Sequence, residues 1–220
     1  MDPFEYLVVL TSIVLGLAVT RVIAGIGNII QTRAKKRTYW VHIIWMVNLM
    51  LTITIVWWVA YRWRTEQHWT FFLFLWLLLT PTLLYLISAL IFPDTDEAQL
   101  VTDWDVYYYQ HHRDIFLLYA LVFPIDLIDT LLKGFAHFRA QGPLYLGTML
   151  LWLVLLLIAA FNRKRSFHAF LALLFLSYNM LLLGTSLITD QSALGASVLA
   201  PKQEPNERTA VDEPDHRGER

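Results

Sequence analysis

Residues 69–92 have the sequence WTFFLFLWLLLTPTLLYLISALIF, and none of these positions carries Asp, Glu, Lys, Arg or His. A helix needs about 20 apolar residues to cross the hydrocarbon core of a bilayer. A soluble core helix of this length would alternate with polar positions, because one of its faces meets water. The stretch therefore predicts a transmembrane helix, and the rest of the chain is interpreted around it.

Five further stretches approach or exceed the same length, which predicts an all-α, multi-pass membrane bundle. The six predicted spans cover residues 4–30, 40–61, 69–92, 115–132, 143–161 and 167–188. The fourth is the shortest and the most polar. The first is predicted to stay as a helix and not to be cleaved as a signal peptide, because it is too long and because acidic Asp2 and Glu5 precede it.

The composition excludes an ordinary soluble domain. Hydrophobic residues make up 57% of the chain and charged residues only 16%, whereas a typical globular chain is about one quarter charged. The absence of Cys excludes disulfides, thiolate nucleophiles and Cys-ligated metals. The net charge of −1 is the sum of two basic loops and one acidic loop, so it gives no information about nucleic acid. No nucleic-acid partner is predicted, and the expected environment and first partner is the lipid bilayer.

The chain is predicted to divide into a membrane domain, 1–188, and a polar, disordered tail, 189–220, which has too little apolar surface to fold. The loop after the third span, residues 93–113, is the only sizeable one. Its apolar side chains recur at helical spacing opposite acidic ones, which predicts a short amphipathic helix on the membrane surface. These apolar residues are Leu100, Val101, Trp104, Tyr107 and Tyr108. A plain acidic connector is the alternative.

Basic residues gather in two loops that six spans would place on the same side. These residues are Arg33, Lys35, Lys36 and Arg37 in the first loop and Arg163, Lys164 and Arg165 in the fifth. Because cytoplasmic loops are enriched in Lys and Arg, this side is predicted to be cytoplasmic. Both termini are then expected outside the cytoplasm.

Five polar residues stand out inside the predicted spans, where each charged or strongly polar group is costly and invites an explanation. They are Arg21, Asn48, Asp126, Asp129 and Asn179. Counted from the predicted cytoplasmic ends, they lie about 12–18 Å deep or slightly deeper, which indicates one polar layer near mid-membrane. The functional interpretation is a binding site for an ion, a proton or a small polar solute. The alternative is a structural clamp, with the Asn residues joining helices.

Within this layer Asp126 is the natural partner for Arg21, because a buried charge is tolerated when it is paired. Asp129 lies one turn further along the same helix face, and no spare cation is evident for it. Pro124 and Pro81 each remove a backbone hydrogen bond from a predicted span. Thr hydroxyls beside Pro81 are expected to satisfy the polar groups that it frees.

The first span carries small residues every four positions, at Ser12, Gly16, Thr20 and Ala24. Such a stripe lets a second helix approach closely. Packing within the bundle is one interpretation. The other is contact with a second copy of the chain or with another membrane protein.

Several His residues lie near the predicted cytoplasmic surface, namely His42, His111, His112 and His168. A pair from different spans would suffice to ligate a haem iron or another metal. No metal-ligand spacing on a single helix supports such a site, so no cofactor is predicted, and haem or a divalent metal is kept as an open alternative.

Residues 12–21, SIVLGLAVTR, and 39–45, YWVHIIW, resemble a group of small bacterial inner-membrane proteins. The similarity covers about the first 95 residues well and the rest loosely. It implies a location in the cytoplasmic membrane of a bacterium and implies nothing about mechanism.

No motif in the chain specifies a reaction, so the sequence gives little support to an enzyme. The mid-depth polar residues favour transport of an ion, a proton or a small polar solute. The small-residue stripe favours a non-catalytic accessory or scaffolding subunit. A haem- or metal-dependent redox protein is the third hypothesis.

Overall fold

The computed structural model describes residues 3–60, 70–93, 98 and 100–199, with only the backbone described over 186–199. The chain divides into two compact units, residues 1–182 and 183–220. The first unit is a bundle of α-helices. In the second, the described residues 183–199 form the last part of a helix that begins in the first unit.

In the part of the chain that the structure describes, six helices are long and apolar enough to cross a membrane, which fits a multi-pass membrane protein. They are α1 (Pro3–Thr32), α2 (Trp40–Ala60), α3 (Phe71–Ile91), α5 (Trp104–Leu132), α7 (Gly142–Phe161) and α8 (Arg165–Leu199). Within α8 the apolar stretch is Arg165–Thr185. A short helix, α6 (Phe135–Ala140), joins α5 to α7. The described residues form no strand, and the prediction of six long apolar helices is confirmed. Their placement across a membrane stays a prediction.

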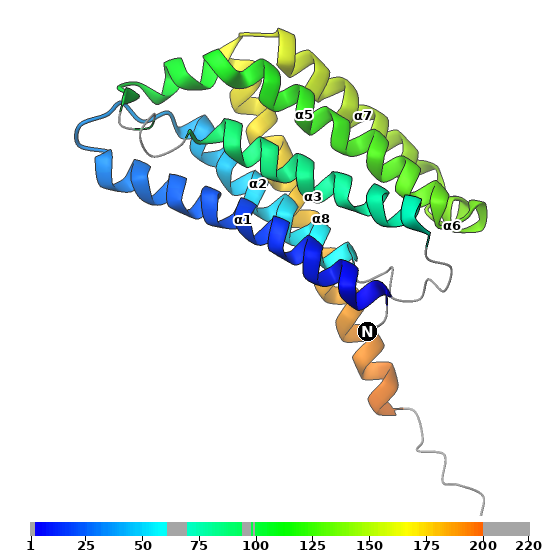
Figure 1. The fold of residues 1–220 in the computed structure, drawn as a ribbon. Coiled ribbons are helices and arrows are strands. Elements are labelled where there is room, and N and C mark those ends of the chain that lie inside the picture. The colour runs from blue at the N-terminus through cyan, green and yellow to red at the C-terminus, as the bar shows by residue number, and fades with distance from the viewer. Residues whose placement is uncertain (1–2, 61–69, 94–97, 99, 200–220) are drawn as a thin grey trace, which may run out of the picture. The chain divides into compact units, whose positions relative to one another are not determined.

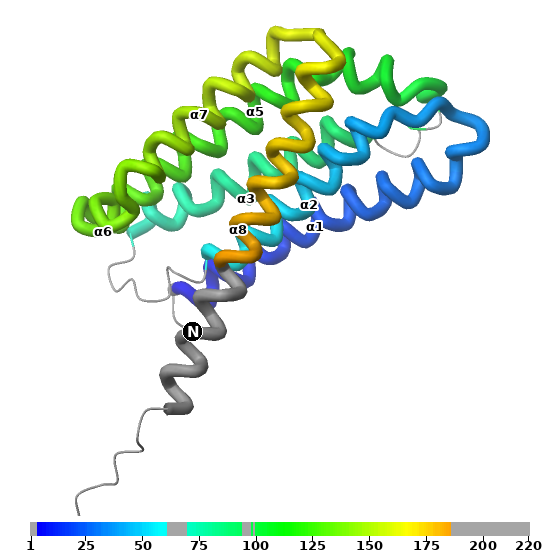
Figure 2. Tube along the Cα trace, turned by 180° about the vertical axis from the view of Figure 1, so that it is seen from behind, coloured from blue at the N-terminus to red at the C-terminus, as the bar shows by residue number. Residues whose placement is uncertain are grey.

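Within the first unit, α3 lies between α1 and α5, and α7 packs against the other side of α5 (Figure 1). Helix α2 packs against α1 and α3, and the part of α8 in this unit packs against α2, α5 and α7 (Figure 2). We call the end at which α1, α3 and α7 begin the N-terminal end, and the other the opposite end. Exposed Leu, Ile and Phe side chains cover the outside of the bundle, as expected for a surface in contact with lipid.

Local sequence explains where several helices begin and end. The Thr70 hydroxyl accepts a hydrogen bond from the Leu73 amide and caps α3, and the Asp103 carboxylate accepts from the Asp105 amide and caps α5. Gly134 and Gly142 have φ angles of 108° and 75°, which L side chains rarely adopt. These two glycines permit the sharp turns on either side of α6.

The core contains a layer of large aromatic rings. This aromatic layer consists of Trp45 of α2, Phe116 and Tyr119 of α5, Trp152 of α7 and Phe175 of α8, all at most 3% exposed. The Trp45 and Phe116 ring centroids are 4.8 Å apart, and those of Trp152 and Phe175 are 4.7 Å apart, in each case edge to face. The layer ties four helices together.

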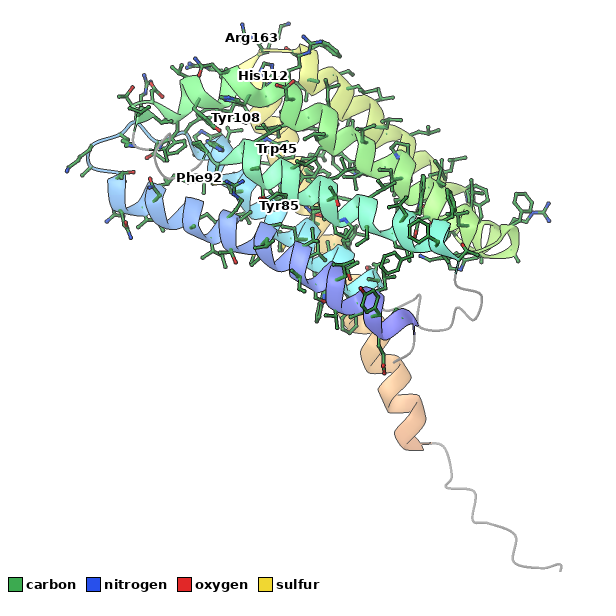
Figure 3. The ribbon with its side chains drawn as sticks, viewed as in Figure 1. Trp45, Tyr85, Phe92, Tyr108, His112 and Arg163 are labelled. Carbon is green, nitrogen blue, oxygen red and sulfur yellow. The ribbon has the colours of Figure 1, made fainter. Side chains whose placement is uncertain are left out.

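At the opposite end, two loops are joined by backbone and side-chain contacts. The Trp104 amide donates to the Arg37 carbonyl at 3.0 Å, and the Arg37 amide donates to the Thr102 carbonyl at 3.2 Å. The side chain of Arg165 binds the largely buried carboxylate of Asp105. Figure 3 labels Tyr108, His112 and Arg163 at this end of the bundle, with Trp45 deeper in the core.

The helix that contains the fourth predicted span begins earlier than that span. Helix α5 starts at Trp104, not at residue 115, because Asp103 caps it and because Trp104 and Tyr108 are buried in the core. The predicted surface helix over the third loop is not confirmed: residues 94–97 and 99 lie outside the described part, and residues 104–113 are the first turns of α5. In the predicted tail, α8 continues to Leu199, and residues 200–220 lie outside the described part.

Candidate functional site

A cavity of about 140 Å³ lies among α1, α2, α3 and α5, toward the N-terminal end. Most of the residues that line it are apolar, and Asp126 and Asp129 of α5 are the charged ones among them. The lining residues are Phe4, Leu7, Val8, Thr11, Leu15, Ile55, Val56, Val59, Ala60, Trp76, Leu77, Thr80, Pro81, Asp126 and Asp129. One wall therefore carries the carboxylates, and the walls from the other three helices are almost entirely apolar.

Each carboxylate is held by a partner near the end of α5. The Tyr145 hydroxyl of α7 donates to Asp126 Oδ2 at 2.8 Å and lies 2.9 Å from the Thr130 hydroxyl. Lys133 Nζ binds Asp129 Oδ2 at 2.7 Å, and both side chains are largely buried. The expectation that no cation was available for Asp129 was therefore wrong, because Lys133 lies one helical turn further along the same face.

The two prolines predicted inside spans lie inside α3 and α5. Pro81 and its neighbour Thr80 line the cavity, and the Thr82 hydroxyl donates to the Leu78 carbonyl at 2.7 Å. A helix interrupted by proline bends more easily, because one hydrogen bond of its ladder is missing. The cavity thus borders the part of α3 in which a backbone hydrogen bond is missing.

Asn48 and Asn179 join α2 to α8 in the core. The Asn179 side-chain amide donates to Asn48 Oδ1 at 3.3 Å, and the Asn48 amide donates to the Ala172 carbonyl at 3.0 Å. Neither residue is more than 2% exposed, and neither lines the cavity. Contacts of this kind join helices, as expected for the structural alternative to a solute site.

Arg21 lies against the Tyr85 ring of α3, with the guanidinium carbon 5.7 Å from the ring centroid. It is six residues beyond Leu15, the last residue of α1 that lines the cavity, which corresponds to about 9 Å along the helix. The structure therefore places Arg21 to one side of the two carboxylates, nearer the opposite end.

The predicted polar layer is divided in two because α5 is longer than expected. Asp126 lies 22 residues from the start of α5, or about 33 Å, and only about 9 Å from its end. Asn48 lies about 12 Å from the start of α2 at the opposite end. The Asp pair thus belongs to the N-terminal end and the Asn pair to the middle of the bundle. Their assignment to one binding site stays a prediction.

The aromatic layer packs between the cavity and the opposite end. Trp45 is ten residues from Ile55 of the cavity wall, which corresponds to about 15 Å along α2. Between Trp45 and Ile55 along α2, the Thr52 hydroxyl lies 3.4 Å from the Tyr119 hydroxyl. The polar contacts at the opposite end are therefore separated from Asp126 by packed rings.

The four candidate His ligands each direct one ring nitrogen to a backbone carbonyl. His42, His111, His112 and His168 lie 2.6–3.0 Å from the carbonyls of Ile91, Tyr107, Tyr109 and Asn162, in that order. The other nitrogen of His168 accepts from the Tyr108 hydroxyl at 2.8 Å. Within the described part of the chain, no three His, Asp or Glu residues are grouped to hold a metal ion. The haem or metal hypothesis stays a prediction.

The small-residue stripe of α1 faces outward over most of its length. Gly16, Thr20 and Ala24 are exposed, and a Cβ atom at Gly16 would meet nothing within 4 Å. Ser12 accepts a hydrogen bond from the Trp57 indole at 3.2 Å. The close approach within the bundle occurs instead at Gly25, where a Cβ atom would lie 2.6 Å from the Phe92 ring. Packing inside the bundle therefore does not account for Gly16, Thr20 and Ala24.

Sequence reasoning missed Tyr145 and Thr130, which complete the surroundings of Asp126. Both residue types are common in membrane helices, and their partners lie on different helices, so no spacing pattern signals them. Lys133 was detectable, because Asp and Lys four residues apart on a helix are neighbours.

Comparison with protein-family models, with curated proteins and with solved structures found no match to this chain. Function is therefore inferred from the geometry alone.

Proposed function

We propose that the protein moves a proton, an ion or a small polar solute across a membrane, with Asp126 and Asp129 as the groups that bind it. One observation carries the proposal: both carboxylates line a cavity whose other described lining residues are apolar apart from Thr11 and Thr80. Ionisable groups inside membrane spans are costly and usually mark a pathway or a proton relay. A carboxylate that served only to join helices would have no need of a cavity beside it.

The position of the cavity favours alternating access over an open channel. The carboxylates lie near the N-terminal end, and the aromatic layer packs between them and the opposite end. Passage along α2 and α5 requires Trp45 and Phe116 to move apart. Pro81 and Pro124 lie in two of the helices that border the cavity. Bending at such weak points is a common way to switch between two packings of a bundle. Asn48 and Asn179 then serve to keep α2 and α8 together.

The direct test uses the purified protein in liposomes, with a trapped pH-sensitive dye to report H⁺ and radiolabelled Na⁺ and tetramethylammonium to report the other two cations. Flux of H⁺, Na⁺ and tetramethylammonium is measured under an imposed gradient, against liposomes without protein. Asp126→Asn and Asp129→Asn are measured singly and together. Asp114→Asn is the matched control, because Asp114 is an exposed carboxylate on the same helix, away from the cavity.

The proposal predicts a protein-dependent flux of at least one of these species. Asp126→Asn should reduce it by about tenfold, as expected for the loss of a charged binding contact, and Asp114→Asn should leave it unchanged. If the double variant conducts as the unmodified protein does, the carboxylates do not serve transport. If none of the three species crosses faster than in liposomes without protein, the carboxylates do not serve transport of these ions.

A second candidate function is that of an accessory or scaffolding subunit, which the outward position of Gly16, Thr20 and Ala24 favours. Small residues every four positions on a lipid-facing surface let a partner helix approach closely. Gly16→Leu should then abolish co-purification of a partner or a second copy. Gly147→Leu is the matched control, because Gly147 is an exposed glycine on α7 that also has nothing within 4 Å. A monomer in mild detergent that is unaffected by either change would exclude this function.

A further inference from the structure

The walls of the cavity differ in chemistry, and the difference specifies what fits between them. Carboxylate oxygens line the α5 wall, and aliphatic and aromatic side chains such as Leu7, Val56 and Leu77 line the others. A bare metal ion would interact favourably only with the carboxylates of the α5 wall. An alkane would interact favourably only with the apolar side chains of the other walls. A molecule that carries a positive group on an apolar body satisfies both.

The size of the cavity limits the apolar body to about one aromatic ring. Its volume of about 140 Å³ is close to that of an engineered apolar cavity of about 150 Å³ that binds benzene. The Trp76 side chain lines the cavity and stacks on Phe72, with ring centroids 6.1 Å apart. Trp is the aromatic side chain that attracts cations most strongly through its ring face, and quaternary ammonium groups are often recognised in this way.

We infer that the cavity binds a small organic cation whose apolar part is about the size of one benzene ring. The inference rests on the proposed transport function and specifies its substrate class. The ammonium group faces Asp126, beside the Asp129 carboxylate that Lys133 already pairs, and the ring lies between α1, α2 and α3. Tyr145 acts as a positioning residue, since its hydroxyl holds Asp126 Oδ2 at 2.8 Å from α7 and does not line the cavity itself.

Equilibrium binding to the full chain in detergent tests the substrate class separately from transport. The probe is radiolabelled benzyltrimethylammonium, which combines one ring with one permanent charge. Two competitors each remove one feature: neopentylbenzene has the same shape and no charge, and tetramethylammonium has the charge and no ring. The inference predicts saturable binding of the probe, with each competitor weaker than unlabelled probe by about tenfold or more.

Three variants locate the binding in the cavity. Asp126→Asn should lower the affinity for the probe by about tenfold, because the charged contact is lost. The affinity for neopentylbenzene should not change, because it makes no charged contact. Leu77→Trp fills the cavity and should abolish binding of both. Leu150→Trp is its control, because Leu150 is exposed on α7 and does not line the cavity. A monodisperse elution profile for each variant confirms that it is folded.

Three results would overturn the inference. Equal affinity for neopentylbenzene and the probe would show a purely apolar cavity, such as one for a lipid tail. Equal affinity for tetramethylammonium and the probe would show a site for any cation. Absence of saturable binding would remove the site for organic cations altogether. In each case a flux of H⁺ or Na⁺ that depends on Asp126 would still support the proposed function, so the two failures are distinguishable.

Discussion

The side-chain amide of Asn179 in α8 donates a hydrogen bond of 3.3 Å to Asn48 Oδ1 in α2, and both side chains are almost completely buried. The same Asn48 donates to the Ala172 carbonyl at 3.0 Å. Helices α2 and α8, which are far apart in the sequence, are thus joined by two hydrogen bonds at Asn48. The two Asn residues belong to the stability of the bundle, whereas the carboxylates of α5 belong to its cavity.

Asn48→Ala should therefore destabilise the bundle. It removes two interhelical hydrogen bonds and leaves the Ala172 carbonyl and the Asn179 amide buried without them, at a cost of about 1–2 kcal/mol. The measurement is equilibrium unfolding in mixed micelles. Thr54→Ala is the control, because the exposed Thr54 hydroxyl bonds only the Met50 carbonyl of its own helix. Equal stability of the two variants would contradict the structural assignment of Asn48.

Gly25→Ala should destabilise the protein although alanine favours helices. The added methyl group would lie 2.6 Å from two atoms of the buried Phe92 ring and 2.9 Å from Met46 Cε. Overpacking of this kind costs about 1–3 kcal/mol. Gly27→Ala on the same helix meets nothing within 4 Å and should be neutral or slightly stabilising. Thermal unfolding of the two variants side by side decides the point, and a Gly25→Ala variant as stable as Gly27→Ala would refute the close approach.

Arg165→Ala should cost more stability than Arg37→Ala. Arg165 binds Asp105, whose side chain is 10% exposed, so the change leaves a nearly buried carboxylate without this cation, at about 1–3 kcal/mol. Arg37 is 73% exposed and lies 3.7 Å from Asp103, so its loss should cost less than about 0.5 kcal/mol. Chemical unfolding at low and high salt measures both. The reverse order of the two costs would contradict the burial of Asp105.

Tyr145→Phe should weaken cation binding and leave the fold intact. The change removes the hydroxyl that donates to Asp126 and contacts Thr130, so the Asp126 carboxylate is no longer held in one orientation by this hydrogen bond. We expect a loss of affinity of about threefold to tenfold, which corresponds to one ordinary hydrogen bond. Tyr6→Phe serves for comparison, because Tyr6 is 59% exposed on α1 at the same end. Unchanged affinity in Tyr145→Phe would show that Asp126 needs no positioning.

The existence of the six apolar helices was predictable from the sequence, because each crossing needs a long apolar run and the charged residues fall between the runs. The residue at which α5 begins was not predictable from the sequence. Residues 104–113 mix acidic, aromatic and His side chains, as a surface segment does, and only the buried contacts of Trp104 and Tyr108 with other helices reveal them as part of a long helix.

The candidate site was predictable in its residue types and not in its grouping. Asp126 and Asp129 stood out as charges inside a span, and the structure keeps them together on one cavity wall. Their separation from Asn48 and Arg21 depends on how far each helix extends beyond its apolar run. An error of eleven residues in the start of α5 moves Asp126 by about 16 Å relative to its neighbours, which is half the hydrocarbon thickness.

The most direct test of the central claim measures the charge and the accessibility of the cavity together. The chain has no native Cys, so Thr80→Cys places a single thiol on the cavity wall. Two membrane-impermeant methanethiosulfonates, one with a trimethylammonium group and one with a sulfonate, are added from the N-terminal side. Ala140→Cys, exposed on α6, gives the reference rates, and Leu84→Cys, fully buried, gives the unreactive limit.

If Asp126 and Asp129 form an accessible cation site, the cationic reagent should modify Thr80→Cys about tenfold faster than the anionic one, relative to Ala140→Cys. Asp126→Asn should bring the two rates together. If Thr80→Cys is as unreactive as Leu84→Cys, or if both reagents react equally with Asp126 in place, the carboxylates do not serve a solute from that side and the proposed function is wrong.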